Sequence, residues 1–328
     1  MVGETSLQCS IRQHCFEGRS TVSENVPFHH QDHSIQLTEG QLLLRSYGSN
    51  SGPPVLVLGG ISGGRDIFTS NGSGWWQGLA EAIPAELNVI SLDYAGGSGD
   101  STVTPVPQRV EGHAILIEQA LQRLGIQHLR AIVGGSFGGV IALELARRGK
   151  LEIGGLAIIG AAHRPTAQAL MLRALQREYI ALAEQAGQTE RGVQLARALA
   201  MLSYRSADGM DTYHPQGTSA VDYILSRSAQ TVAKAPSRAR NFFTAFGPAL
   251  DQYRINPTEI SVPTLLVGFD SDQLVSAQVL NELAEKLPRC AGLHLLPSSY
   301  GHDGFIKNTA SYASICHNFI LELAVERS

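Results

Sequence analysis

A serine set among glycines is the residue of this chain best suited to nucleophilic chemistry. Residues 134–139 read Gly-Gly-Ser-Phe-Gly-Gly, follow the mostly apolar segment 129–133 and precede a helix-like segment. A strand, a tight glycine turn with a central serine and then a helix is typical of a nucleophile elbow, which holds the hydroxyl at the carboxyl end of a parallel strand. Gly134 and Gly138 leave room around Ser136 in this strained turn. An ordinary strand-to-helix turn with the same residues is the alternative.

An acid and a histidine follow the serine, each just after a strand-like segment. One apolar segment leads into Asp270 and Asp272, and a later one, 292–296, leads through a short loop to His302. Because parallel strands present their carboxyl ends at one edge of a sheet, these side chains should reach Ser136. His302 would take the serine proton, and a carboxylate would orient the imidazole and stabilise its cation. We prefer Asp272, deeper in the loop, as this acid, because Asp270 suits a turn at the strand end.

Acyl chemistry at a serine also needs backbone N–H groups that stabilise the oxyanion of the tetrahedral intermediate. The residue after the nucleophile, Phe137, is expected to give the first of them. The glycine-rich loop 59–64 follows the strand-like segment 55–58, and glycines let backbone approach a substrate closely. We expect Ile61 in this loop to give the second N–H. A phosphate-binding loop is the alternative, but the Gly-Lys-Ser/Thr ending and the dinucleotide-binding spacing are both missing.

The overall composition argues against several other functions. The chain has 328 residues, of which 43% are hydrophobic and 16% charged, and its formal net charge is −4. This is the composition of a soluble globular protein, without the basic field that nucleic-acid binding needs. We expect no membrane span and no signal peptide, since no apolar run is long enough and the N-terminus is polar. Four scattered cysteines without a CxxC pair predict no metal site and fit a reducing cytoplasm.

The order of the elements predicts an α/β fold. After an expected hairpin over 34–45, buried strand-like segments alternate with amphipathic helices, which is typical of a mostly parallel sheet with helices on both faces. A helix-rich insertion at 164–255 should form a cap over the catalytic edge and shape substrate access, although a purely structural packing domain is the alternative. The core then has two parts, 1–163 and 256–328. The helices expected in the cap cover 167–186, 191–202, 221–234 and 237–246.

With these motifs in place, the chain resembles the homoserine O-acyltransferases of the MetX type, within the α/β-hydrolase superfamily. The resemblance runs from about residue 40 onward and is to a shorter branch of the family. The loop Gly-Gly-Ile-Ser-Gly-Gly-Arg stands where the family commonly has a His-Ala-Leu-Thr-Gly loop. The matching segments are 74–76, the elbow at 134–139, 196–206 in the cap, 271–275 at the acid and 300–305 at the histidine.

The resemblance implies a specific reaction. An acyl group, acetyl or succinyl, would pass from acyl-CoA to Ser136 and then to the hydroxyl of L-homoserine, giving a precursor of methionine. The resemblance assigns Asp272 and His302 as the triad acid and base, and it implies no metal and no tightly bound cofactor. Family members often form dimers through the cap, so a homodimer is implied here as well.

The resemblance also assigns the residues that bind the acceptor. Arg197 and Tyr204 match cap residues that bind the amino acid, and Asp303 matches the acid that holds its amine. A zwitterion needs such a pair, because a guanidinium binds a carboxylate at two points and a carboxylate binds an ammonium. Arg197 and Tyr204 are seven positions apart and so share one face of a helix. Arg65, just past the oxyanion loop, is a candidate contact for a succinyl carboxylate or a coenzyme A phosphate, or else a surface residue.

Three other functions fit parts of this pattern. A carboxylesterase or thioesterase would share the chemistry up to the acyl-enzyme and then use water. A related acyltransferase would act on serine or on another small hydroxyl compound. A binding protein with a hydrolase fold would need no triad, so the intact set of Ser136, Asp272 and His302 argues against that function.

Overall fold

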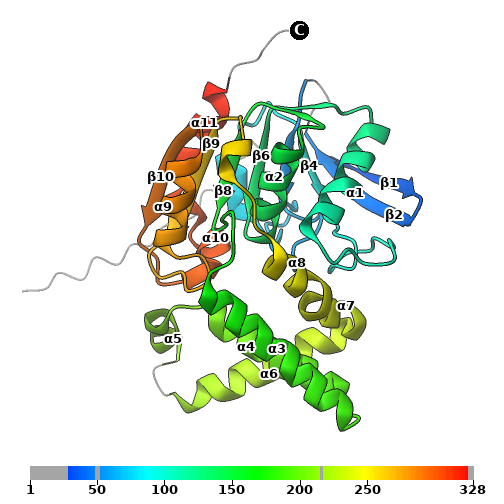
Figure 1. Cartoon of the computed structure of the whole chain (residues 1–328), viewed down its shortest axis with the longest axis vertical. Helices are drawn as coiled ribbons and strands as arrows, with labels where there is room; N and C mark the ends of the chain where they lie inside the picture. The colour runs from blue at the N-terminus through cyan, green and yellow to red at the C-terminus, as the bar shows by residue number, and fades with distance from the viewer. Residues whose placement is uncertain (1–28, 49–51, 215–216, 324–328) are drawn as a thin grey trace, which may run out of the picture.

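The centre of the molecule is an eight-stranded, mostly parallel sheet (Figure 1). The computed structural model describes residues 29–48, 52–214 and 217–323. The strand order is β1-β2-β4-β3-β6-β8-β9-β10; β2 pairs antiparallel with β1 and β4, and the other neighbours pair in parallel. The strands are β1 His30–Leu37, β2 Gly40–Tyr47, β3 Val55–Leu58, β4 Val89–Leu92, β6 Ala131–Gly135, β8 Leu156–Ile159, β9 Thr264–Phe269 and β10 Cys290–Leu296, with a separate small pair of β5 His128–Leu129 and β7 Glu152–Ile153.

Helices cover both faces of this sheet. The central strands β3, β4, β6, β8 and β9 are buried at every residue, and their side chains alternate between two hydrophobic clusters. Leu56 of β3 belongs to the cluster with α1, α2 and α9, whereas Val57 belongs to the cluster with η1 and α11. These helices are α1 Val110–Arg123, α2 Phe137–Arg148, α9 Ala277–Lys286, α11 Ala313–Glu322 and the 3₁₀ helix η1 Gln77–Ala82. The predicted α/β class and the N-terminal hairpin are both confirmed.

A layer of helices between β8 and β9 forms the cap, which lies below the sheet in Figure 1. Within it α3 packs on α4, and α4 packs on α6. The chain leaving α4 also touches the core, because a Cβ on Gly301 would lie 2.8 Å from the backbone of Arg205 and Ser206. The cap helices are α3 Ala167–Gln185, α4 Thr189–Tyr204, α5 Ala207–Tyr213, α6 Thr218–Lys234, α7 Pro236–Asn241 and α8 Gly247–Gln252.

Several boundaries differ from the prediction. The helix expected over 237–246 is wrong as a single element, because α7 ends at Asn241 and a π-helical turn, Phe242–Phe246, follows. The short helix α5 was not expected at all. The elbow strand expected over 129–133 is divided between β5 and β6. In the ranges that the structure describes, no helix is both long and apolar enough to cross a membrane.

Candidate active site

The strand β6 ends in a turn that holds Ser136 in an unusual backbone conformation. Ser136 has φ 52° and ψ −117°, and among the described residues it is the one non-glycine with a positive φ. Such a conformation is costly for an L-residue and is typical of functional sites. Two glycines make the turn possible: a Cβ on Gly134 would lie 2.6 Å from the Gly139 Cα, and one on Gly138 would lie 2.1 Å from the Leu58 carbonyl oxygen.

Three loops at the carboxyl edge of the sheet bring the predicted triad side chains together. Ser136 follows β6, Asp272 follows β9 and His302 follows β10. The Ser136 hydroxyl lies 2.8 Å from His302 Nε2, and His302 Nδ1 lies 2.7 Å from Asp272 Oδ2. Because a carboxylate only accepts, Nδ1 donates to it, which leaves Nε2 free to accept the serine proton. The second oxygen, Asp272 Oδ1, accepts from the backbone N–H groups of Leu274 at 2.8 Å and Val275 at 3.0 Å.

The two candidate acids, Asp270 and Asp272, have different partners in the structure. Asp272 is buried against His302. Asp270 lies at the end of β9, where its Oδ1 accepts a hydrogen bond from the Ser298 N–H at 3.0 Å. Asp270 therefore ties together the two loops that carry the acid and the histidine, as expected of a turn residue, while the geometry favours Asp272 as the partner of the base.

The electrostatic environment of His302 suits a general base. Burial favours the neutral imidazole, but the adjacent Asp272 carboxylate outweighs this effect and raises the pKa of His302 above its ordinary value. Asp303 raises the pKa further, and Arg173 lowers it. The imidazolium that forms when the serine loses its proton is thus stabilised where it is made.

The glycine-rich loop after β3 lies beside the nucleophile. Its first carbonyl, on Gly59, accepts hydrogen bonds from the Tyr94 hydroxyl at 2.9 Å and from the Gly138 N–H at 2.8 Å. A Cβ on Gly60 would lie 3.9 Å from the Ser136 Cβ, and Ile61 lines the same cavity as Ser136. Phe137 is the first residue of α2, where N–H groups have no acceptor within the helix. The oxyanion-hole roles of Ile61 and Phe137 stay predictions, and this geometry is compatible with them.

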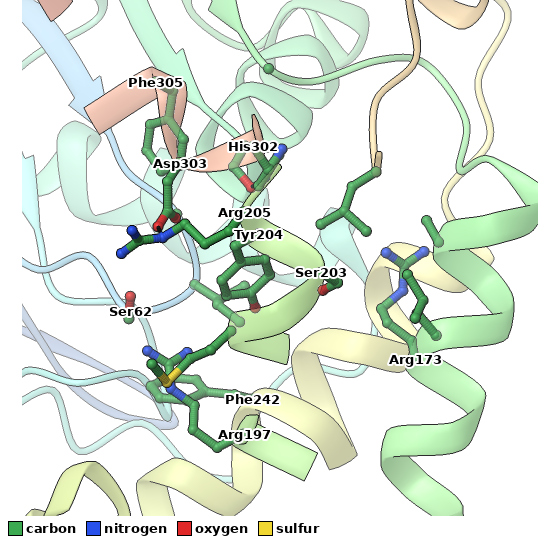
Figure 2. A pocket seen from close by; sticks show the side chains of 18 of the residues that line it. Ser62, Arg173, Arg197, Ser203, Tyr204, Arg205, Phe242, His302, Asp303 and Phe305 are labelled. Carbon is green, nitrogen blue, oxygen red and sulfur yellow. Dashed lines mark hydrogen bonds and ion pairs between the residues drawn. The ribbon is translucent and has the colours of Figure 1, made fainter. Parts of the chain in front are cut away.

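A cavity of about 970 Å³ extends from Ser136 and His302 into the cap (Figure 2). Arg197 and Tyr204 of α4 line it, together with Asp303. The Arg197 Cζ lies 5.9 Å from the centre of the Tyr204 ring, and that ring lies 6.0 Å from the His302 ring. The structure thus brings every predicted acceptor residue to the cavity that holds the nucleophile.

Arg205 and Arg173 are among the charged cavity residues that the sequence did not predict. Arg205 donates from Nε to Asp303 Oδ2 at 2.6 Å, so the carboxylate expected to hold an amine already has a partner in the same chain. Arg173 reaches the cavity from α3. Arg205 lies within the cap motif and directly follows Tyr204, which is a signal that could have found it, whereas nothing in the sequence distinguished Arg173 from Arg177, the other arginine of α3.

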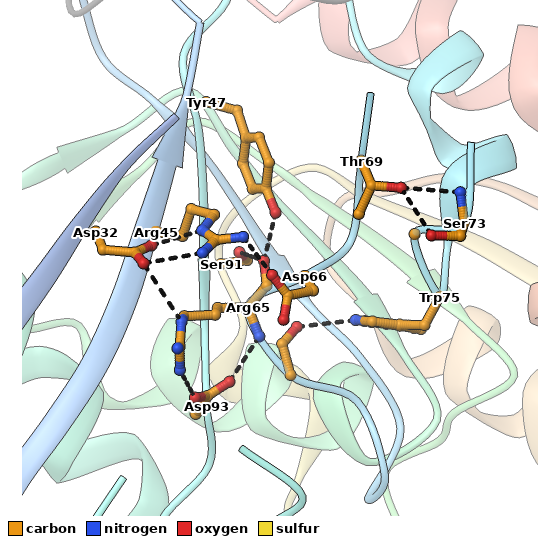
Figure 3. A network of polar contacts seen from close by, with 12 residues as sticks. Asp32, Arg45, Tyr47, Arg65, Asp66, Thr69, Ser73, Trp75, Ser91 and Asp93 are labelled. Carbon is orange, nitrogen blue, oxygen red and sulfur yellow. Dashed lines mark hydrogen bonds and ion pairs between the residues drawn. The ribbon is translucent and has the colours of Figure 1, made fainter. Parts of the chain in front are cut away.

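Arg65 does not lie with the other predicted site residues. It is absent from the residues that line the cavity, and its guanidinium binds Asp93 and, at 3.1 Å, Asp100. Figure 3 shows it in a network that also joins Asp32 and Arg45. Arg65 therefore anchors the end of the glycine-rich loop to neighbouring strands, and the geometry gives no support to a contact with the acyl donor.

No metal site accompanies this arrangement in the part of the chain that the structure describes. No group of three or more histidine, cysteine, aspartate or glutamate side chains is placed to hold an ion there. The chemistry available at the cavity is that of an activated serine with fixed charges around it.

The fold and the Ser-His-Asp geometry define the class of protein. Residues 53–309 match the family described as the alpha/beta hydrolase fold. A homoserine O-succinyltransferase from Xanthomonas campestris pv. campestris is 32% identical over 86% of this chain and 78% of its own length. A homoserine O-acetyltransferase from Nostoc punctiforme is 26% identical over 92% of this chain and 98% of its own. The chain therefore belongs to the homoserine O-acyltransferase family of α/β-hydrolases, and it is an acyltransferase by class.

A solved structure supports the fold assignment. Homoserine O-acetyltransferase from Staphylococcus aureus superposes with a TM-score of 0.76, covering 91% of this chain and 98% of that chain. Its sequence is 21% identical, so this likeness concerns the fold alone.

Proposed function

We propose that this protein transfers an acyl group from acyl-CoA to the hydroxyl of L-homoserine through an acyl-enzyme on Ser136. The observation that carries the proposal is the pairing of two features in one cavity. One is the hydrogen-bonded set of Ser136, His302 and Asp272; the other is a set of opposite charges, Arg197 and Asp303, on the cavity wall. A zwitterionic acceptor with a hydroxyl group needs both.

The first half-reaction loads the enzyme. The Ser136 hydroxyl attacks the thioester carbonyl and gives its proton to His302 Nε2. The oxyanion is stabilised by the N–H groups of Phe137 and Ile61, each worth roughly 3 kcal/mol in comparable sites. The carbon–sulfur bond breaks, His302 returns the proton to the departing sulfur, and coenzyme A leaves with the acyl group esterified to the serine.

The second half-reaction transfers the acyl group from Ser136 to the acceptor. Arg197 and Tyr204 bind the carboxylate of homoserine, and Asp303 binds its ammonium. His302 Nε2 takes the proton of the acceptor hydroxyl as that oxygen attacks the acyl-enzyme, and it then protonates Ser136 as the ester bond breaks. The product is an O-acyl-L-homoserine, which places the enzyme in methionine biosynthesis.

A hydrolase is the second candidate, because it shares every step up to the acyl-enzyme. The charged wall favours transfer: Figure 2 shows Asp303 above Tyr204 and Arg197 below it, and a zwitterionic acceptor needs these opposite charges whereas water as acceptor does not. Serine, one methylene shorter than homoserine, is an alternative acceptor with the same charges. The two relatives differ in the acyl group that their names give, so both acetyl-CoA and succinyl-CoA are candidate co-substrates.

The test is the release of free thiol from acetyl-CoA and from succinyl-CoA, each measured with and without L-homoserine or L-serine. Release that requires homoserine supports the transferase and names the donor. Release that is indifferent to both amino acids, together with hydrolysis of p-nitrophenyl acetate, supports the hydrolase instead. Trapping of the acyl group on Ser136, checked by mass spectrometry of the digested protein, tests the two-step route.

We also propose a homodimer formed through the cap, in the cytoplasm. Met171, Leu175, Tyr179 and Leu182 are large apolar side chains exposed along one face of α3, and patches of this kind mark association surfaces. The cytoplasm is proposed because acyl-CoA is found there and because Cys290 and Cys316 are free thiols.

A further inference from the structure

An unbalanced positive charge lies in the cap beside the cavity. Arg173 and Arg177, one turn apart on α3, share the single carboxylate of Asp251 on α8. Arg173 Nε lies 2.5 Å from Asp251 Oδ1, and Arg177 Nη1 lies 2.8 Å from Asp251 Oδ2. Two guanidinium groups and one carboxylate leave one positive charge, which a second carboxylate would neutralise.

Each arginine of this cluster has one buried nitrogen without a hydrogen bond, but Arg177 Nη1 is the atom that faces Asp251, whereas Arg173 faces Asp251 with its Nε. Arg173 Nη2 is buried and has no hydrogen-bond partner in the protein. The whole Arg173 side chain is only 15% exposed, so water has little access to it. An unpaired buried donor on a charged group is costly, so the site gains from any ligand that accepts from it. Of the two arginines, Arg173 lines the cavity and Arg177 does not.

Arg173 lies apart from the residues that bind the acceptor. Figure 2 shows it on the far side of Tyr204 and Ser203 from the ion pair of Arg205 and Asp303. Its charge nevertheless acts on the reaction centre, because it is one of the groups that lower the pKa of His302. Leu172, Leu250 and Phe243 are among the apolar side chains that line the same cavity, and an ionic contact that is partly removed from water is stronger than one in bulk solvent.

We propose that Arg173 binds the free carboxylate of a dicarboxylic acyl group carried on Ser136, so that the preferred donor is the coenzyme A monothioester of a short dicarboxylic acid such as succinate. This inference rests on the proposed function. In the loading step the acyl carbon forms its bond to Ser136 Oγ and loses its bond to sulfur, the proton passes through His302 to the thiol, and the distal carboxylate stays ionised against the guanidinium throughout.

The other anionic groups in the proposed reaction are the acceptor carboxylate and the coenzyme A phosphates, and both fit other parts of the cavity better than Arg173. The acceptor carboxylate has Arg197, which carries its own unpaired buried Nε. The phosphates of coenzyme A are bulky and strongly hydrated, and the exposed cations Arg227 and Lys234 on α6 line the same cavity. The mostly buried guanidinium of Arg173 on the cavity wall suits a small carboxylate at the end of a short chain.

The experiment compares kcat/KM for succinyl-CoA and acetyl-CoA, with homoserine as acceptor, in the native protein and in Arg173→Met, Arg173→Lys and Arg177→Met. Arg177→Met is the matched control, because it removes the other ion pair with Asp251 without removing a cavity group. We expect the native protein to prefer succinyl-CoA. The ratio of the two kcat/KM values should fall roughly 30-fold or more in Arg173→Met, fall less in Arg173→Lys, and stay within about threefold in Arg177→Met.

Comparing the two donors also shows whether Arg173 binds the carboxylate of the acyl group or a phosphate of coenzyme A. Acetyl-CoA carries the same phosphates as succinyl-CoA, so an equal loss with both donors in Arg173→Met would assign Arg173 to coenzyme A or to structure and overturn the inference. Equal falls in the ratio for Arg173→Met and Arg177→Met would overturn it too. A native protein that uses acetyl-CoA and not succinyl-CoA would refute the donor inference while leaving the transferase intact, whereas no homoserine-dependent transfer from either donor would refute both.

Discussion

The guanidinium of Arg205 donates to the carboxylate of Asp303 at 2.6 Å, immediately beside the residue that activates the nucleophile. In the proposed reaction Asp303 is thus oriented in advance, with one oxygen bonded to Arg205 of the cap and the other assigned to the acceptor ammonium. Because Arg205 comes from the cap and Asp303 from the core, the pair also links the proposed acceptor site to the position of the cap.

The first prediction concerns Asp303. Replacing it with Asn keeps its shape and removes the charge that the acceptor ammonium needs. We expect KM for homoserine to rise about tenfold or more, since charge-assisted hydrogen bonds contribute on the order of 1.5–3 kcal/mol. The rate at which acyl-CoA loads Ser136, measured in single-turnover experiments without homoserine, should change much less. Equal losses in loading and in homoserine use would show that Asp303 does not act on the acceptor.

The second prediction concerns Arg197. In Arg197→Ala we expect kcat/KM for homoserine to fall roughly a hundredfold, because a two-point carboxylate contact is lost. Hydrolysis of p-nitrophenyl acetate, which presents no carboxylate, should be largely retained. If ester hydrolysis and acyl transfer fall together, Arg197 serves the fold of the cap and not the amino acid.

The third prediction concerns pH. A base must be neutral to accept a proton, and the pKa of His302 is raised by Asp272. The acidic limb of kcat/KM should therefore lie above about pH 6.5, the ordinary value for histidine. In Asp272→Asn the raising charge is gone, so the limb should move to lower pH while the rate falls about 10⁴-fold, as in comparable triads. If the acidic limb of kcat/KM does not move in Asp272→Asn, the limb reports the titration of a group other than His302.

The fourth prediction tests the elbow. In Gly138→Ala the new methyl group would lie 2.1 Å from the Leu58 carbonyl oxygen, so the turn must shift, at a cost of about 3 kcal/mol in the free energy of unfolding. Gly149→Ala at the other end of α2 is the control: Gly149 has a positive φ of 59°, which Gly138 lacks, but a Cβ there meets nothing within 4 Å, and we expect a loss of only about 1 kcal/mol from the backbone conformation. Denaturant unfolding of both variants measures the difference.

The fifth prediction concerns the exposed face of α3. Introducing charge with Leu175→Glu and Leu182→Glu should dissociate a cap-mediated dimer, because two like charges would meet across a two-fold axis. Light scattering coupled to size-exclusion chromatography gives the mass directly. A native protein that is monomeric at micromolar concentration would contradict the dimer.

The core of the site was predictable because it depends on local chemistry. The glycines around Ser136 are needed by one turn, and a strand-end position is sufficient to place Asp272 and His302 at the same edge. The contacts inside the cap were not predictable in this way. Arg173 meets Asp251 only because α3 packs near α8, and Arg65 meets Asp93 only because two strands adjoin. The hydrophobic periodicity of the sequence predicts where helices form. Which helices then lie next to one another depends on how their side chains pack.

The strands β8 and β9 adjoin in the sheet, with Ile159 opposite Val267, although the entire cap is inserted between them. Loop-closure entropy grows only with the logarithm of the length, by about 0.6 kcal/mol for each doubling, so the sheet can close over inserts of very different sizes at little thermodynamic expense. During folding, however, this pairing joins distant parts of the chain and is expected to form late. In evolution, the same connection would let a lineage exchange its helical insert, and with it the cap side of the cavity, without moving the serine.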